Sequence, residues 1–166
     1  MRTSFRSTDK GGSGGSLPFV RALAAFLALP GIVAFAAPIA MGLSSGSALR
    51  YIGVAATLLI GGSGLLLWCV REFYVRGRGT LAPWAPPQWL VTSGPYRLTR
   101  NPMYLAVLVI LLGWSALWGS RALLLYALAV HVATHLRVRL FEEPWAAQRF
   151  GAEWEAYRAR VPRWLL

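Results

Sequence analysis

The chain has 166 residues, which allows one domain of moderate size. Hydrophobic residues make up 56% of it and charged residues 14%, whereas an ordinary soluble domain carries about 25% charged residues. This composition argues against a soluble protein, and the single cysteine, Cys69, excludes an intramolecular disulfide framework. The net charge of +11 is spread between membrane-length apolar stretches, so we expect no nucleic-acid partner.

The N-terminal region divides into a polar tail and an apolar stretch. Residues 1–16 end in a Gly-Ser repeat, which predicts a flexible tail that buries no core. The stretch 17–43 is long enough to cross a bilayer, since a span needs about 20 residues. Pro30 and Pro38 should kink this helix, so neighbouring helices must satisfy the carbonyl oxygens that proline leaves free. A cleaved signal peptide is the alternative, although the apolar stretch is long for one.

Three further apolar stretches predict spans over about 51–70, 102–118 and 122–141. Glycines within 51–70 should let another helix approach closely. The connection Trp118-Gly119-Ser120-Arg121 is so short that the last two spans must form an antiparallel hairpin. We therefore expect residues 17–166 to form a single all-α integral membrane domain with four transmembrane helices.

The distribution of charge predicts the orientation of these spans. All Lys and Arg residues except Arg50 and Arg121 fall on one side if the N-terminus, the loop 71–101 and the tail 142–166 share that side. The positive-inside rule makes this side cytoplasmic, so both termini should lie in the cytoplasm. Polar residues 93–104 and the pair Glu142-Glu143 then meet at one end of the hairpin, a region that we call the hairpin mouth.

The first half of the hairpin mouth predicts an anion site. Asn101-Pro102 has the form of a helix start, because an Asn side chain can cap free backbone N–H groups and Pro at the first position loses no hydrogen bond. The positive end of the helix dipole then lies beside Arg100. Such an arrangement suits a carboxylate or a phosphate.

The second half predicts a cation site. Two adjacent carboxylates, Glu142 and Glu143, near the C-terminal end of a helix are unfavourable without a cationic partner. A cationic ligand would supply one, whereas a purely structural alternative is an ion pair between Arg139 and Glu143. His131 and His135 lie on the same helical face, where packing or hydrogen bonding is favoured because no third metal ligand is evident; we expect no metal.

The tail after Pro144 shows helical periodicity. Its large apolar residues recur at helical spacing: Phe150, Trp154, Tyr157 and Val161. This pattern predicts an interfacial amphipathic helix that ends at Pro162. The helix would anchor the tail to the membrane, or cover the hairpin mouth with Tyr157 or Arg158 reaching inward.

An ordered set of motifs surrounds the hairpin. They are Gly94-Pro95-Tyr96-Arg97, Arg100-Asn101-Pro102-Met103-Tyr104, Glu142-Glu143-Pro144, Phe150-Gly151, Tyr157 and Val161-Pro162-Arg163. In these motifs the chain resembles the isoprenylcysteine carboxyl methyltransferase family and the related membrane phospholipid methyltransferases, in the form of their bacterial members. The resemblance implies a location in a bacterial inner membrane. The resemblance covers about half of the chain, roughly residues 76–164, and spans one and two are similar in character only.

The resemblance implies an S-adenosylmethionine-dependent methyltransferase acting on a lipophilic or small acceptor that enters from the bilayer. The residues implied or positioned to bind the cofactor are Gly94, Pro95, Tyr96, Arg100, Asn101, Pro102, Tyr104, His135, Glu142, Glu143, Tyr157 and Arg158. Arg100, Tyr104 and Glu142 are the candidates for catalysis. The alternatives are a non-catalytic membrane subunit or lipid-binding accessory protein that keeps the fold, and a reductase, which the absence of a nicotinamide-binding region disfavours. The acceptor atom and the oligomeric state do not follow from the sequence.

Overall fold

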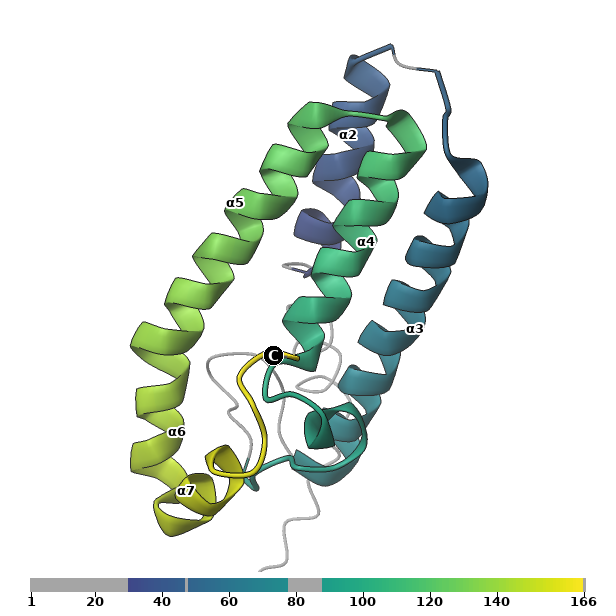
Figure 1. Cartoon of the computed structure of the whole chain (residues 1–166). Coiled ribbons are helices and arrows are strands. Elements are labelled where there is room, and N and C mark those ends of the chain that lie inside the picture. The colour runs from purple at the N-terminus through teal and green to yellow at the C-terminus, as the bar shows by residue number, and fades with distance from the viewer. Residues whose placement is uncertain (1–29, 47, 78–87, 166) are drawn as a thin grey trace, which may run out of the picture.

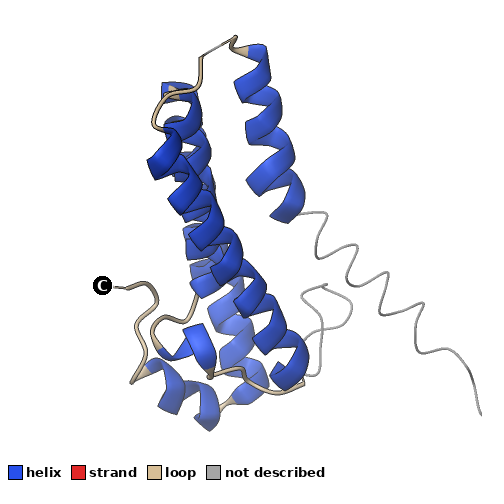
Figure 2. Cartoon of the chain, turned by 90° about the vertical axis from the view of Figure 1, so that its right-hand side faces the viewer, coloured by secondary structure: helices blue, strands red, loops and turns tan. Residues whose placement is uncertain are grey.

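The computed structural model describes residues 30–46, 48–77 and 88–165. Within these residues the only regular secondary structure is helical, as Figure 2 shows, so the expected all-α class is confirmed for this part of the chain. The expected tail 1–16, the first part of the span 17–43 and residues 78–87 of the expected loop 71–101 lie outside the described residues.

The helices form a bundle in which α4 is central. It is flanked by α3 and α5 and also contacts α2 (Figure 1), and its most extensive packing is against α3. The elements in chain order are η1 (Ile32–Ala36), α2 (Ala37–Ser44), α3 (Ile52–Gly77), η2 (Gly94–Arg97), α4 (Pro102–Trp118), α5 (Arg121–Arg137), η3 (Val138–Glu142), α6 (Glu143–Phe150) and α7 (Ala152–Arg158). Of these, η1 and η3 are π-helical turns and η2 is a 3₁₀ turn.

Two helical runs, Ile52–Gly77 and Arg121–Phe150, are long and apolar enough to cross a membrane. Only 17% of the most apolar window of each is buried within the protein, unlike the core helix of a soluble domain. The runs Ile32–Ser44 and Pro102–Trp118 are apolar but shorter. These lengths support a membrane protein, while the arrangement of four spans stays a prediction.

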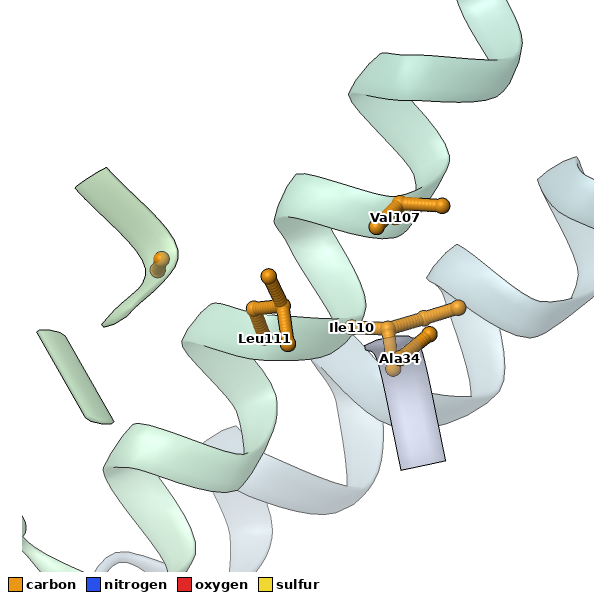
Figure 3. Packing of buried hydrophobic residues seen from close by; sticks show 5 residues of the cluster. Ala34, Val107, Ile110 and Leu111 are labelled. Carbon is orange, nitrogen blue, oxygen red and sulfur yellow. The ribbon is translucent and has the colours of Figure 1, made fainter. Parts of the chain in front are cut away.

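The centre of the bundle is an aliphatic cluster built around α4. Ile110 and Leu111 are fully buried there, together with Val107 of the same helix and Ala34 of η1. Figure 3 shows Ile110 of α4 directed toward Ala34. Because these aliphatic side chains carry no polar atom that would need a hydrogen-bond partner, α4 can lie inside the bundle.

Glycine at two positions allows α3 and α4 to pack closely. A Cβ atom on Gly62 would lie 2.8 Å from Cγ1 of Ile110, and one on Gly113 would lie 2.9 Å from Cγ of Leu59. The close approach expected from the glycines of span two is therefore confirmed at Gly62. Three other glycines of α3 have open space around the Cβ position: Gly53, Gly61 and Gly64.

The π-turn η1 leaves carbonyl oxygens that the neighbouring helices satisfy. Pro38 has no N–H to donate to Ala34 four residues earlier, and the indole of Trp114 donates to that oxygen at 2.8 Å. The hydroxyl of Tyr126 donates to the oxygen of Val33 at 3.1 Å. The expectation that neighbouring helices satisfy the carbonyl freed by a proline of the first apolar stretch is thus confirmed at Pro38.

Helix α3 is longer than the sequence predicted. The span was expected to end at residue 70, but the helix continues to Gly77. No helix-breaking residue occurs between 71 and 76, and Glu72 pairs with Arg76 one turn later at 2.9 Å. The first part of the expected loop, residues 71–77, is therefore a helical extension that carries a carboxylate.

The predicted single amphipathic helix in the tail is wrong in its bounds. The run from α5 continues through η3 and α6 to Phe150, then breaks at Gly151, whose φ of 50° is left-handed. The short α7 ends at Arg158, before Pro162. The apolar face is nevertheless the buried one, because Trp154, Tyr157 and Val161 pack together with Ala146 of α6 inside the protein.

Candidate functional site

One end of the bundle collects the polar residues of the hairpin mouth. The end of α3, the turn η2, the start of α4 and the helices α6 and α7 meet there (Figure 1). A C-terminal segment, residues 159–165, runs back from α7 to the start of α4, where the backbone N–H of Arg100 donates to the carbonyl of Pro162 at 2.9 Å. Residues more than sixty positions apart are thus held together.

Glu143 is paired with two arginines from distant parts of the chain. Nη1 of Arg100 lies 2.8 Å from its Oε1, and Arg163 donates from Nε to Oε1 at 2.8 Å and from Nη2 to Oε2 at 2.7 Å. The cationic partner that this carboxylate was expected to need therefore comes from the protein itself. The alternative pairing with Arg139, which is exposed, is not the one that the structure has.

Glu142 faces a different neighbour. Its Oε1 accepts hydrogen bonds from the hydroxyl of Tyr104 at 2.5 Å and from Nε of Arg137 at 2.8 Å. Successive residues of a helix point about 100° apart, so the adjacent carboxylates diverge to separate partners. Tyr104 and Glu142, both expected in the site, are brought into direct contact.

Arg100 has one nitrogen that the protein leaves unsatisfied. Its guanidinium lies 5.5 Å from the centre of the Trp154 ring and pairs with Glu143 through Nη1. Its Nε is buried and has no hydrogen-bond partner among the described residues. Burial lowers the pKa of Arg100 from its ordinary value, and the charge of Glu143 opposes that shift. A buried N–H without an acceptor is unfavourable, so a ligand oxygen would be stabilised there.

Asn101 does not cap α4 in the way that the sequence suggested. It occupies the position before the helix, with Pro102 next as predicted, but its side chain makes no capping hydrogen bond. Instead Nδ2 donates to the carbonyl of Arg163 at 3.1 Å, and the hydroxyl of Thr99 donates to the same oxygen at 2.9 Å. The helix start is therefore bound to the C-terminal segment rather than closed by its own side chain.

The turn η2 presents backbone rather than side chains. Gly94 adopts a left-handed φ of 58°, Pro95 is buried, and the ring of Tyr96 packs against Phe73 of α3 with centroids 5.9 Å apart. The carbonyl of Tyr96 accepts the hydroxyl of Tyr157 at 2.7 Å. Burial raises the pKa of Tyr96, and it raises the pKa of Tyr157 to about 12. Both hydroxyls are therefore neutral at physiological pH.

Two expected site residues have other roles in the structure. Nδ1 of His135 accepts a hydrogen bond from the indole of Trp164 at 3.0 Å, which fixes the end of the C-terminal segment against α5. Arg158, which was expected to reach inward, is exposed and pairs with Glu155 of its own helix at 2.6 Å. Of the two tail residues proposed to cover the site, Tyr157 alone points inward.

The residues expected in the site did not include Glu72, Arg163 or Trp164. Glu72 was assigned to a loop, although its spacing of four residues from Arg76 was a helical signal. Arg163 formed part of a recognised motif, yet its partner lies twenty residues away and no local pattern connects them. Within the described residues, no group of three or more His, Cys, Asp or Glu side chains is placed to hold a metal.

The fold and site define a helical membrane protein with a cluster of arginines and glutamates at one end of its bundle. A family model of phospholipid methyltransferases matches residues 49–153. Since the match covers more than half of the chain, the protein belongs to the phospholipid methyltransferase family and is by class a membrane methyltransferase. No curated protein and no solved structure matches the chain. The family expected from the sequence is thus confirmed, and the segment 159–165 lies beyond the matched region.

Proposed function

We propose that this protein uses S-adenosylmethionine to methylate a lipophilic or small acceptor that reaches the hairpin mouth from the bilayer. The observation that carries the proposal is the buried, unpartnered Nε of Arg100 beside the start of α4, in a chain of a methyltransferase family. The acceptor and the atom that receives the methyl group are left open.

The residues at the mouth fit the charges of this cofactor. Its carboxylate would be held by Nε of Arg100 and by the first N–H groups of α4, which have no partner within the helix and receive no capping bond from Asn101. Its ammonium group would be held by Glu142, because both protein hydrogen bonds to that carboxylate use Oε1 and Oε2 can accept another.

The chemistry needs little from the protein beyond placement. Bound S-adenosylmethionine supplies a methyl group that its positively charged sulfur has already activated. The protein side chains then have to orient the reactants and exclude water, and both contributions favour a displacement reaction. Tyr104 and Glu142, joined by a hydrogen bond, are the pair that we expect to orient a polar group of the acceptor.

The membrane arrangement that suits this function has four spans. The stretch 17–43 and helices α3, α4 and α5 cross the bilayer, the tail containing α7 lies at the cytoplasmic surface, and both termini are cytoplasmic. Support comes from the apolar faces that α3 and α5 turn outward, with Leu67, Leu125 and Leu128 each more than half exposed. Such surfaces favour lipid over water.

The experiment that tests the proposal is calorimetric titration of the purified protein in detergent with S-adenosylhomocysteine. We expect saturable binding by the wild type and loss of binding in Arg100→Ala and Glu142→Ala. Arg149→Ala is the matched control, because Arg149 is an exposed arginine on α6. A folded wild-type protein that binds no S-adenosylhomocysteine would overturn the proposal.

Transfer itself is measured with an isotopically labelled methyl donor and extracted membrane lipids. Labelled product that depends on Glu142 supports a methyltransferase. Cofactor binding without transfer to any lipid would instead favour the non-catalytic accessory protein. Binding of NADPH, followed spectroscopically, would favour the reductase.

A further inference from the structure

Glu72 is a buried carboxylate for which the proposed function gives no role. The residue is 5% exposed, although it lies near the end of α3. Its Oε2 accepts a hydrogen bond from the hydroxyl of Ser93 at 2.6 Å and pairs with Nε of Arg76 at 2.9 Å. Its Oε1 lies 3.3 Å from Nη1 of Arg71. A buried charge is unfavourable unless it is well partnered, so the burial of Glu72 indicates a structural or functional role.

The contact with Ser93 is long-range and replaces a local one. Ser93 occupies the cap position of η2, where a Ser side chain commonly bonds the backbone of its own turn, but it makes no such bond. Its hydroxyl instead donates to Glu72, twenty-one residues earlier. The side chain therefore ties the start of η2 to α3.

Gly94 closes the turn directly over the same carboxylate. Its φ of 58° is left-handed, and a Cβ atom there would lie 2.9 Å from Cγ of Glu72 and 3.2 Å from Nε1 of Trp68. Glycine is thus required both for the backbone conformation and for the close approach. The turn η2 therefore packs directly against the side chain of Glu72.

The turn held in this way leads directly into the candidate cofactor site. Two residues after Gly94, the carbonyl of Tyr96 accepts the hydroxyl of Tyr157, and the backbone N–H of Thr99 donates to the oxygen of Pro95 at 3.4 Å. Arg100 follows at once. A displacement of η2 would therefore move both the anchor of α7 and the arginine proposed to bind the cofactor.

We propose that Glu72 is a positioning residue of the cofactor site, which sets the place of Arg100 through Ser93 and Gly94. The inference rests on the proposed function, because it concerns the same site. Glu72 itself touches no reacting group and acts through the turn, whereas Arg71 and Arg76 serve only to balance its charge.

The experiment compares the affinity for S-adenosylhomocysteine with thermal stability in four variants. Ser93→Ala and Glu72→Gln should each weaken binding about tenfold, which corresponds to one hydrogen bond to a charged group. The double variant should bind no more weakly than the weaker single variant, because both changes remove one shared contact. Ser93→Thr keeps the hydroxyl and should restore binding.

Arg71→Ala provides the matched control. It removes an ion-pair partner of the same carboxylate from a side chain that is 69% exposed, without touching Ser93. We expect the thermal midpoint of Arg71→Ala to fall by a small amount, similar to that of Ser93→Ala. Its affinity for S-adenosylhomocysteine should stay within about twofold of the wild type.

The outcomes separate the two proposals. Absence of binding by the wild type contradicts the proposed function. If the wild type binds and Ser93→Ala binds with the same affinity, the positioning role of Glu72 is overturned while the proposed function stands. The same holds if the losses of affinity in Ser93→Ala and Glu72→Gln simply add in the double variant. Ser93→Ala decides the question even if Glu72→Gln does not fold.

Discussion

Arg163 forms a bidentate ion pair with Glu143, with Nε to Oε1 at 2.8 Å and Nη2 to Oε2 at 2.7 Å. The carbonyl oxygen of the same arginine accepts hydrogen bonds from Thr99 and Asn101 at the start of α4. One residue of the C-terminal segment therefore links α6 to α4. The hydrogen bond to Glu143 raises the pKa of Arg163, so the pair stays charged at all physiological pH values.

Replacing Arg163 should destabilise the site end of the bundle. Arg163→Ala leaves Glu143 with Arg100 as its remaining partner and should lower the free energy of unfolding by about 2 kcal/mol, less than for a fully buried pair. Arg163→Lys should retain only part of this stability, because an ammonium group cannot make the two parallel hydrogen bonds that the guanidinium makes to Glu143. Thermal unfolding in detergent measures the effect. Glu155→Gln, in an exposed pair on α7, is the control and should change stability by less than about 0.5 kcal/mol.

Asn101→Asp distinguishes the observed role of Asn101 from that of a helix cap. Asp and Asn are about equally good caps, so a capping role would leave stability nearly unchanged. In the structure the side chain donates to the carbonyl of Arg163, and Asp has no donor to replace that amide. We expect a loss of about 1–2 kcal/mol in urea or thermal unfolding. Unchanged stability would show that the donor contact is not formed in solution.

The buried hydroxyl of Tyr157 should make stability fall at alkaline pH. Its pKa is about 12 in the folded protein, against an ordinary value of 10.0. Between these values the unfolded chain releases the proton and the folded protein keeps it, so the free energy of unfolding decreases as pH rises. The contribution is complete below pH 10 and is lost by about pH 12. Tyr157→Phe should flatten the dependence of the thermal midpoint on pH over this interval.

Two observations check that result. At neutral pH Tyr157→Phe should cost about 1 kcal/mol, because the hydrogen bond to the carbonyl of Tyr96 is lost. Tyr51→Phe, at an exposed tyrosine, is the control and should leave the alkaline slope as it is in the wild type. Equal slopes in wild type and Tyr157→Phe would contradict the prediction.

The hydrogen bond from the indole of Trp114 should contribute to stability, because Pro38 has no N–H to donate to the carbonyl of Ala34. Trp114→Phe keeps an aromatic ring but leaves the carbonyl of Ala34 without its donor, which should cost about 1–3 kcal/mol in thermal unfolding. Pro38→Ala restores a backbone N–H four residues after Ala34 and should recover part of the loss in the double variant. If the double variant is no more stable than Trp114→Phe, proline is not the reason for the contact.

Local signals in the sequence explain which parts of the fold could be predicted. The bounds of α4 follow from Pro102 at one end and Gly119, which has a left-handed φ of 57°, at the other. The end of α3 was missed because the charges of Arg71, Glu72 and Arg76 suggested a loop, whereas an ion pair between Glu72 and Arg76 stabilises the helix there. The break at Gly151 was missed because the apolar spacing continues across it.

The site could be predicted as a set of residues but not as a set of contacts. The hairpin brought Tyr104 near Glu142 as expected, since both lie on helices whose connection is short. No pattern indicated that Glu143 would pair with Arg163, or that Asn101 would donate to its carbonyl. These contacts depend on how the C-terminal segment folds back, and that path is determined by tertiary packing around Trp154 and Tyr157.

The π-turn η3 sets the rotational phase of the helix that follows it. It ends at Glu142, and each residue added to or removed from a helix turns everything beyond by about 100°. A regular α-helical path through the five residues Val138–Glu142 would turn the carboxylates by about 100° and direct them away from Tyr104 and Arg100. The partners of the two glutamates therefore depend on the wider turn at Val138–Glu142 as well as on their positions in the sequence.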